Sequence, residues 1–495
     1  MGRVSELKNK SRTSLTIIGG GPGGYEAALV AARLGAQVTV VERAGIGGSA
    51  VLTDVVPSKS LIATSDAMRR LRQSPSMGVR FGTGEHNDVR DPDASVDLAA
   101  VNKRLLRLAH SQSTDIRRLL QASGIRVIKG TGKLTAERDV ELVELAENPE
   151  EGNRELPETP IKVGDVLPSD AVLIAVGAHP RELPTAKPDG ERIFNWTQLY
   201  EMEELPEHLI VIGSGVTGAE FASAYNLLGS HVTLISSRDR VLPGEDSDAA
   251  EVLEDVFVRQ GIEVLARSRA ESVERIDDGV LVTLSDGSQV RGSHCLVAVG
   301  SIPNTADLGL EEAGVAVSES GHIQVDGVSR TSATNVYAAG DCTGVFQLAS
   351  VSAMQGRTAV AHLLGDGVKP FRPYQVSSNI FTAPEIATVG ITQAMVDAGD
   401  YQADVVKLDF ATNARAKMLN VQDGFVKIFS RTGSGTVLGA VVVAPRASEL
   451  IYPLAIAVTQ KLHVDAVAET YTVYPSLSGS IGEAARRLHM NSLML

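Results

Sequence analysis

Two stretches of the chain share one pattern of apolar residues and glycines. Residues 14–43 read SLTIIGGGPGGYEAALVAARLGAQVTVVER, and residues 208–237 read HLIVIGSGVTGAEFASAYNLLGSHVTLISS. Each stretch predicts an apolar strand, a glycine-rich turn, an amphipathic helix and, after a further glycine, a second apolar strand. This order is typical of a βαβ unit, whose parallel strands lie in a sheet that helices cover. The chain is therefore predicted to hold two α/β domains of the same kind.

The first glycine turn has the spacing that binds a dinucleotide. Gly19, Gly21 and Gly24 form a G-x-G-x-x-G motif between the first strand and the helix. The first glycine permits a tight turn, the second lets a pyrophosphate approach the backbone, and the third lets helix and strand pack closely. The pyrophosphate would lie at the positive N-terminal end of the helix. Glu42 ends the second strand, where a carboxylate accepts hydrogen bonds from ribose hydroxyls and repels a 2′-phosphate.

The second glycine turn differs at the position of that acid. Its glycines are Gly213, Gly215 and Gly218. Ser236 stands where Glu42 stands in the first copy, and Ser237, Arg238 and Arg240 follow it. Hydroxyl and guanidinium groups can hold a 2′-phosphate by charge-assisted hydrogen bonds, so this site favours NADPH over NADH. The alternative is that the arginines only face solvent.

Two other segments suggest binding or catalysis. Residues 331–344 read TSATNVYAAGDCTG, in which Asp341 ends a predicted strand before a turn. Its carboxylate could bind a sugar hydroxyl or simply cap the following helix. Residues 47–59 read GGSAVLTDVVPSK. The glycine pair and the PSK frame an interval that lacks any group able to carry out covalent or redox chemistry.

Length and charge narrow the class of protein. With 495 residues the chain is too long for one core and is expected to form roughly three or four domains. The net charge of −14 argues against nucleic acid or anionic lipid as the main partner. No apolar run approaches the ~18 residues of a membrane span, and the polar N-terminus does not resemble a signal peptide. We therefore expect a cytoplasmic protein without stable membrane insertion.

The two cysteines, Cys295 and Cys342, are isolated in the sequence. Neither has CxxC or metal-ligand spacing, and the ten histidines form no HxxxH pair. We expect two buried, reduced thiols and no metal site.

Taken together, these motifs resemble the class I pyridine nucleotide–disulfide oxidoreductases of the lipoamide dehydrogenase and glutathione reductase type. The resemblance covers about residues 15–487 and rests on GGGPGGY, the GG…PSK frame, GSGVTGAE, VAVGSIPNT, YAAGD and FTAPEIATVG. It implies FAD on the first βαβ unit, a nicotinamide cofactor on the second, and a homodimer built by the C-terminal domain. Within the family, the chain is most similar to the actinobacterial NAD(P)H quinone reductases, which lack a complete redox disulfide.

The resemblance also implies a fold class and a domain order. We expect an α/β fold with two Rossmann-like domains, one binding FAD and one binding NAD(P), and a C-terminal α+β dimerisation domain. In the C-terminal part, the strand-like runs EIATVG, GFVKIFS and TVLGAVVVA alternate with one predicted helix, SELIYPLAIAVTQ. The predicted boundaries are a polar extension at 1–13, the FAD-binding and central domain at 14–185 and 304–370, the NAD(P)-binding domain at 186–303, and the interface domain at 371–495.

Several residues acquire roles from the resemblance. Glu42 would hold the adenosine ribose of FAD, and Asp341 would hold the ribityl chain. Lys59 would lie beside flavin N5 and pair with Glu220. An ammonium group there stabilises negative charge on a reduced flavin, and a carboxylate partner keeps a buried lysine charged. The remaining residues assigned to cofactor-binding segments are Gly47, Gly48, Gly177, Gly300 and Ala349.

The chain departs from the family at the disulfide. Members with disulfide chemistry carry two cysteines where this chain has Ala50 and Val55. They also carry a His-Pro pair and an orienting glutamate near the C-terminus, where YTVYPSLSG places Tyr474 and Gly479. Because thiol–disulfide exchange needs a thiolate, we expect no reduction of lipoamide or glutathione by that route.

Every element for hydride transfer from NAD(P)H to FAD is kept, so the leading hypothesis is a FAD-dependent NAD(P)H:quinone oxidoreductase. Small apolar side chains at the lost disulfide would open a slot for a flat acceptor such as a quinone. Tyr474 of the partner subunit would hydrogen-bond the quinone oxygen, or else only pack at the dimer interface. The expected donor is NADPH, with NADH also accepted. The alternatives are a soluble NAD(P) transhydrogenase, and a non-enzymatic flavoprotein subunit or redox sensor. The physiological acceptor stays open.

Overall fold

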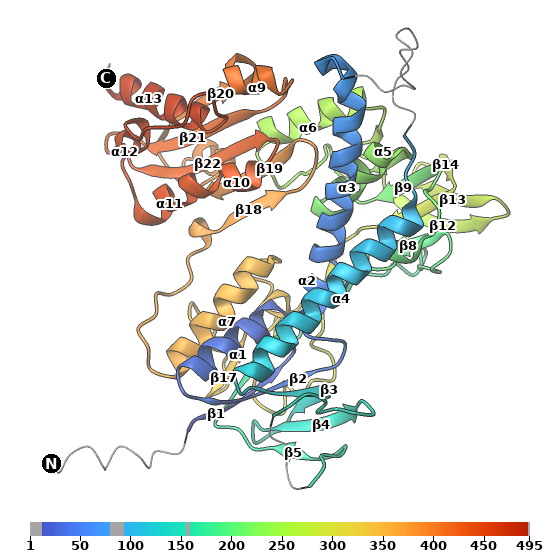
Figure 1. Ribbon diagram of the computed structural model, residues 1–495, viewed down its shortest axis with the longest axis vertical. Coiled ribbons are helices and arrows are strands. Elements are labelled where there is room, and N and C mark those ends of the chain that lie inside the picture. The colour runs from blue at the N-terminus through green and yellow to red at the C-terminus, as the bar shows by residue number, and fades with distance from the viewer. Residues whose placement is uncertain (1–11, 80–93, 155–158, 494–495) are drawn as a thin grey trace. The chain divides into compact units, whose positions relative to one another are not determined.

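The computed structural model of the chain describes residues 12–79, 94–154 and 159–493 (Figure 1). Most of the predicted polar extension at 1–13 lies outside these residues. The described chain forms two compact units. The first unit comprises Met1–Ser58, Lys103–Arg181 and Ser301–Phe371. The second unit comprises Lys59–Asn102, Glu182–Gly300 and Arg372–Leu495. Each unit is therefore built from stretches that are far apart in the sequence.

A mixed sheet forms the centre of the first unit, with the strand order β17-β6-β1-β2-β3-β4-β5. The strands from β17 to β3 run parallel, and β4 and β5 continue the sheet antiparallel. These strands are β1 (Ser14–Ile18), β2 (Gln37–Glu42), β3 (Arg126–Leu134), β4 (Val140–Leu145), β5 (Val166–Leu167), β6 (Ala171–Ile174) and β17 (Val336–Ala338). A separate antiparallel ribbon pairs β7 (Ala178–Pro180) with β16 (Ser301–Pro303).

The helices of the first unit are α1 (Pro22–Arg33), α2 (Gly48–Leu52) and α7 (Ala349–Leu363). Two longer helices, α3 (Val55–Gln73) and α4 (Leu98–Ala122), have residues in both units. The first predicted βαβ unit is thus β1-α1-β2. Apolar residues at helical spacing over about residues 97–122 also predict a helix, and this helix is α4.

Helices α1 and α7 lie side by side (Figure 1) because glycines let their backbones approach each other. A Cβ atom at Gly356 in α7 would collide with the carbonyl oxygen of Gly23 in α1. A Cβ atom at Gly23 would in turn lie 3.1 Å from the Cβ of Ala339, which follows β17. The buried residues of α1 are all small, namely Gly23, Gly24, Ala27, Ala28 and Ala31.

Replacing Gly356 by Ala should therefore destabilise the first unit. Overpacking against a backbone atom is expected to lower the free energy of unfolding by about 1–3 kcal/mol, although Ala favours a helix by about 1 kcal/mol over Gly. Urea unfolding followed by far-UV circular dichroism measures the change. The control is Gly367→Ala, because a Cβ there meets nothing within 4 Å. If Gly356→Ala unfolds at the same urea concentration as the control, the close contact carries no stability.

The second unit contains the other predicted βαβ unit, β9-α5-β10, within a parallel sheet of order β11-β10-β9-β15-β8. An antiparallel sheet of order β12-β13-β14 accompanies it. The strands are β8 (Ile193–Asn195), β9 (His208–Ile212), β10 (His231–Ile235), β11 (Glu263–Leu265), β12 (Ala270–Ile276), β13 (Gly279–Leu284), β14 (Gln289–Gly292) and β15 (His294–Val297). The helices here are α5 (Val216–Leu228) and α6 (Ser247–Arg259).

The C-terminal part of the second unit is an antiparallel sheet of order β18-β19-β22-β21-β20, on which α11 and α13 pack (Figure 1). The strands are β18 (Ser377–Ile380), β19 (Glu385–Gly390), β20 (Ala403–Asp409), β21 (Phe425–Arg431) and β22 (Val437–Ala444). The helices are α8 (Gln393–Asp397), α9 (Ala414–Met418), α10 (Ala447–Leu450), α11 (Tyr452–Gln460), α12 (Val464–Ala468) and α13 (Gly479–Leu493). The three strand-like runs of the sequence are β19, β21 and β22, and the predicted fold class is confirmed.

One C-terminal helix differs from its prediction. The run SELIYPLAIAVTQ forms two helices, α10 and α11, with a break at Ile451. Pro453 lies in the first turn of α11. A proline has no N–H to continue the hydrogen bonds of a preceding helix, but it is tolerated where a helix begins. Among the described helices, none combines the length and the apolar character that crossing a membrane requires.

Candidate active site

In the first glycine loop, Gly19 and Gly24 are closely packed, whereas Gly21, the middle glycine of the motif, is open. Gly19 has φ +104°, and a Cβ there would collide with the carbonyl oxygen of Ala175. A Cβ at Gly24 would collide with the carbonyl oxygen of Gly19, so this glycine sets the distance between α1 and β1. At Gly21 a Cβ would meet nothing within 4 Å. The open backbone at the start of α1 fits the approach of a pyrophosphate.

Glu42 organises the loops around this glycine turn. One carboxylate oxygen accepts a hydrogen bond from the N–H of Gly20 at 2.6 Å. The other accepts from the N–H groups of Ala44 at 2.7 Å and Gly45 at 3.1 Å. An ionised carboxylate offers about four lone-pair positions, so acceptor capacity remains for a ribose hydroxyl. The ribose contact of Glu42 stays a prediction, and the structure adds a role in holding the loop.

The glycine pair Gly47-Gly48 packs on the same loop. The N–H of Gly47 donates to the carbonyl of Gly20 at 2.8 Å. Gly48 has φ +57°, and a Cβ there would lie 3.0 Å from the Cα of Gly21. Both glycines therefore shape the loop, whatever chemistry follows them in the chain. Ala50 and Val55, at the positions of the family's cysteines, are partly exposed.

Asp341 begins a short 3₁₀ turn, η4 (Asp341–Thr343), and Ala339 and Gly340 separate it from the end of β17. Burial, and then the negative charge of Asp54, raise the pKa of Asp341 to about 6. The turn is held by Gly340, whose N–H donates to the side chain of Gln355 in α7 at 2.9 Å. Ala349 is the first residue of α7, and Gly177 has φ +66° with open space where a Cβ would stand.

The charge of Asp341 should destabilise the FAD-free protein at neutral pH. Its folded-state pKa of about 6 lies above the ordinary 3.8, so ionisation costs stability as the pH rises through this range. Asp341→Asn should raise the free energy of unfolding of the FAD-free protein at about pH 7.5 by on the order of 1–3 kcal/mol. The gain should shrink towards about pH 4. Thermal unfolding of both proteins at several pH values measures it, and a pH-independent gain would contradict the assignment.

The second glycine loop repeats the geometry of the first. Gly213 has φ +110°, and a Cβ there would collide with the carbonyl oxygen of Ala298. A Cβ at Gly218 would collide with the carbonyl oxygen of Gly213, whereas Gly215 is open. Gly300 has φ +92° and is open as well.

The residues after β10 that are predicted to bind a 2′-phosphate differ in burial. Ser236 is fully buried, and its hydroxyl pairs with that of Ser214 at 2.7 Å and accepts from the N–H of Arg238 at 3.1 Å. These bonds fold the turn itself. Ser237 and Arg238 are exposed, and Arg240 is half-buried beside Asp239. The exposed pair is thus available to a 2′-phosphate, while Ser236 holds the turn in shape.

Lys59 and Glu220 are brought together within the second unit. Lys59 Nζ lies 2.7 Å from Glu220 Oε2, and their side chains are 28% and 6% exposed. The other carboxylate oxygen of Glu220 accepts from the N–H of Phe381 at 2.8 Å. The Phe381 ring centroid lies 5.0 Å from Lys59 Nζ. Phe381 was not assigned from the sequence, although FTAPEIATVG was among the family motifs.

Tyr474 lies on an exposed apolar segment before α13. Tyr474 is 85% exposed, and Tyr471 and Val473 are 103% and 78% exposed. Contiguous exposed apolar residues of this kind are typical of a protein interface. Gly479 is the first residue of α13. The structure thus leaves Tyr474 available to a partner, and its predicted contact with an acceptor stays a prediction.

The cysteines lie away from the 47–59 segment in the sequence and are buried in the core. Cys295 is in β15 and Cys342 is in η4, and both are free thiols. Burial raises the pKa of each thiol, which disfavours the thiolate. Within the described residues, no cluster of histidine, cysteine and acidic side chains could hold a metal ion.

Comparison with known proteins agrees with this geometry. The family model for pyridine nucleotide-disulphide oxidoreductases matches residues 13–356, and the model for their dimerisation domain matches residues 376–485. The NAD(P)H dehydrogenase (quinone) of Mycobacterium tuberculosis (strain CDC 1551 / Oshkosh) is 50% identical over 480 residues, covering 96% of this chain and 94% of that protein.

Two further relatives extend the comparison. The dihydrolipoyl dehydrogenase of Bacillus subtilis (strain 168) is 31% identical over 475 residues, covering 95% of this chain and 97% of that protein. A crystal structure of LpdA from Mycobacterium tuberculosis matches with a TM-score of 0.88 at 48% identity, covering 96% of this chain and 99% of that one. The chain belongs to the pyridine nucleotide-disulphide oxidoreductase family.

Proposed function

We propose that the chain is a FAD-dependent NAD(P)H:quinone oxidoreductase without dithiol–disulfide activity. One observation carries the proposal: the glycine loops and the Lys59–Glu220 pair are present, whereas Ala50 and Val55 replace the redox cysteines. The relative that is 50% identical is named NAD(P)H dehydrogenase (quinone), which supports a quinone as the acceptor.

The first unit offers a cradle that fits FAD. The open backbone at Gly21 would receive the pyrophosphate, and the carboxylates of Glu42 and Asp341 would bind hydroxyls of the ribose and the ribityl chain. A bound FAD supplies the chemistry of accepting a hydride from a reduced nicotinamide and passing the electrons to an acceptor. Binding a ribityl hydroxyl would also give the buried carboxyl of Asp341 a hydrogen-bond partner.

Lys59 and Glu220 would supply the electrostatics of the site. Glu220 is held by two bonds, one from Lys59 and one from the backbone of Phe381, so its charge is fixed in place. A fixed carboxylate holds the ammonium of Lys59 in one orientation. An ammonium beside the flavin would stabilise negative charge there.

The acceptor would meet the site where the disulfide is missing. Ala50 and Val55 offer methyl and isopropyl groups instead of sulfur, which suits a flat apolar molecule. The dimerisation-domain match supports a homodimer, in which Tyr474 of the partner subunit would border the acceptor. A phenol can donate a hydrogen bond to a quinone oxygen.

Turnover with different acceptors tests this function. Purified FAD-loaded protein should oxidise NADPH rapidly with menadione and should show no turnover with lipoamide, because no thiolate is available to exchange. Absorbance at 340 nm follows the donor in both assays. Robust lipoamide reduction without quinone activity would contradict the proposal. Faster reduction of a thio-NAD analogue than of any quinone would instead identify a transhydrogenase.

In the assay with menadione, Tyr474→Phe should raise the KM for menadione if the phenol contacts the quinone.

The donor preference is a separate part of the proposal. Ser237 and Arg238 are the exposed groups at the end of β10, so we expect them to bind the 2′-phosphate of NADPH. Arg238→Ala should raise the KM for NADPH about tenfold and change the KM for NADH by less than about twofold. Arg269→Ala is the matched control, since Arg269 is an exposed arginine of the same unit outside this turn. Equal effects on both donors would contradict the assignment.

A further inference from the structure

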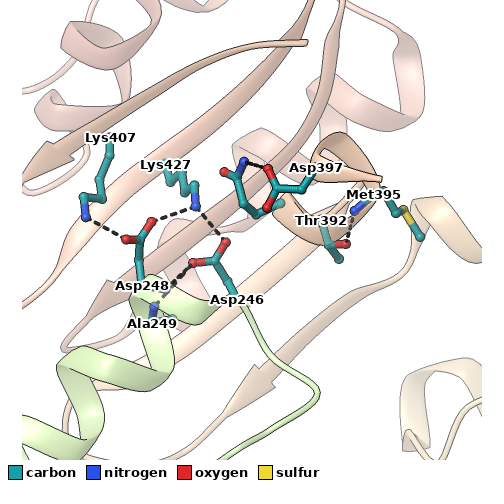
Figure 2. A network of polar contacts seen from close by, with 9 residues as sticks. Asp246, Asp248, Ala249, Thr392, Met395, Asp397, Lys407 and Lys427 are labelled. Carbon is teal, nitrogen blue, oxygen red and sulfur yellow. Dashed lines mark hydrogen bonds and ion pairs between the residues drawn. The ribbon is translucent and has the colours of Figure 1, made fainter. Parts of the chain in front are cut away.

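A buried network of charges connects the nucleotide-binding part of the second unit to its C-terminal sheet (Figure 2). Lys427 Nζ lies 2.9 Å from Asp246 Oδ2 and 2.7 Å from Asp248 Oδ2. Lys407 Nζ lies 2.9 Å from Asp248 Oδ1. The side chains of Lys427 and Asp246 are only 3% and 2% exposed. Two cations and two carboxylates therefore balance each other, with Lys427 and Asp246 buried and Lys407 and Asp248 in contact with solvent.

The two lysines need these carboxylates. Lys407 in β20 and Lys427 in β21 are direct cross-strand partners, and like charges in that position repel. The other residues of β21 up to Ser430 are buried, and the Lys427 ammonium lies 5.5 Å from the Phe429 ring centroid. Asp248 bridges both lysines, and their hydrogen bonds lower its pKa although burial alone would raise it. The sheet thus presents a pair of cations that fits the first turn of α6.

The carboxylates also fix the end of the loop that we assign to the 2′-phosphate. Asp246 caps α6 by accepting from the N–H groups of Asp248 at 3.1 Å and Ala249 at 3.3 Å. The 236–246 loop begins at Ser236, whose hydroxyl bonds Ser214 in the glycine loop. Its middle is tied by the N–H of Leu242, which donates to the carbonyl of Ser214 at 2.9 Å. Ser237 and Arg238 therefore lie between two bonds to the glycine loop, at Ser236 and Leu242, and the carbonyl of Arg238 accepts from the N–H of Arg267 at 2.7 Å. Beyond Leu242, the far end of the loop is anchored to Lys427 through Asp246.

We propose that Lys427, acting through Asp246, is a positioning residue for NADPH recognition. It holds the far end of the 236–246 loop, so that Ser237 and Arg238 are presented to the 2′-phosphate. This inference rests on the donor preference proposed above. It assigns the C-terminal sheet a part in choosing between NADPH and NADH, although that sheet supplies no predicted nucleotide contact.

The design of the test follows from the burial of the network. Removing Lys427 alone would leave Asp246 as an uncompensated buried charge, which destabilises a fold whatever its function. Lys427→Met combined with Asp246→Asn removes both charges and keeps a side chain that caps helices well. Asp248 then keeps its bond to Lys407. Lys407→Met is the matched control, because Lys407 is 43% exposed and does not contact Asp246.

The readout compares the two nucleotides on FAD-loaded protein. The double variant should raise the KM for NADPH about fivefold to tenfold and leave kcat and the KM for NADH within about twofold, because only the phosphate contact is displaced. Lys407→Met should leave all of these within about twofold of the parent protein. An unchanged KM for NADPH in the double variant, or equal rises for both nucleotides, would overturn the proposal and leave the network with a structural role.

Two further measurements keep the outcomes distinct. Calorimetric binding of NADP⁺ and NAD⁺ needs no acceptor, so a selective loss of NADP⁺ affinity would support the inference even if quinone turnover failed. If the parent protein binds NADP⁺ and NAD⁺ with equal affinity, the donor preference on which the inference rests is wrong, and the inference is overturned with it. If the double variant does not fold, Asp246→Asn alone keeps the Lys427–Asp248 bond. That variant should still weaken NADP⁺ binding about twofold to threefold, and NAD⁺ binding less. Equal weakening of the two would overturn the inference.

Discussion

Close approach of backbone atoms at the two glycine turns is the constraint on which the rest of the molecule depends. In both βαβ units the third glycine lies against the carbonyl of the first, Gly24 on Gly19 and Gly218 on Gly213. A side chain at either position would push the helix off its strand and displace the helix N-terminus. The middle glycines stay open, so a polar helix end faces a space where an anionic group can lie. Both predicted nucleotide sites thus follow from the absence of a Cβ atom at a few positions.

The same constraint explains how a family member could lose its disulfide and keep the surrounding motif. Gly47 and Gly48 pack on the loop at Gly20 and Gly21, so both glycines contribute to the shape of the cradle proposed for the cofactor. The side chains of Ala50 and Val55, at the positions of the family's cysteines, are partly exposed and carry no hydrogen-bonding group that could hold the glycine loop. The hydrogen bonds that shape the cradle are made by Glu42 and by the backbone of Gly20 and Gly47, so they do not use the side chains at these two positions. The glycine pair and the PSK segment can therefore keep their structure without a redox disulfide. The question that follows is which electron acceptor the protein uses.

Local pattern allowed the fold to be predicted, whereas contacts between distant residues did not follow from it. Apolar periodicity and glycine spacing predicted both βαβ units, α4 and three C-terminal strands, because these depend on neighbours in the chain. The break between α10 and α11 was missed, although Pro453 is a residue that favours the first turn of a helix over its interior. The burial of Ser236 and the bond from Phe381 to Glu220 were also missed. In the latter case the partners lie 161 positions apart, and Asp246 lies 181 positions from Lys427. Sequence pattern marks each residue, but it does not say which two will meet.

Two lysines illustrate how burial separates a chemical role from a positioning one. Lys427 has carboxylates on two of its three N–H directions and an aromatic ring nearby, and it is 3% exposed. Its charge is fully compensated, so it can hold a segment in place but has little left to offer a ligand. Lys59 has one carboxylate partner and is 28% exposed. An ammonium with donors to spare at an accessible position can still stabilise charge on a bound group. The two pairs share the same chemistry, and the difference in compensation agrees with the roles proposed for them, Lys59 beside a cofactor and Lys427 within the chain.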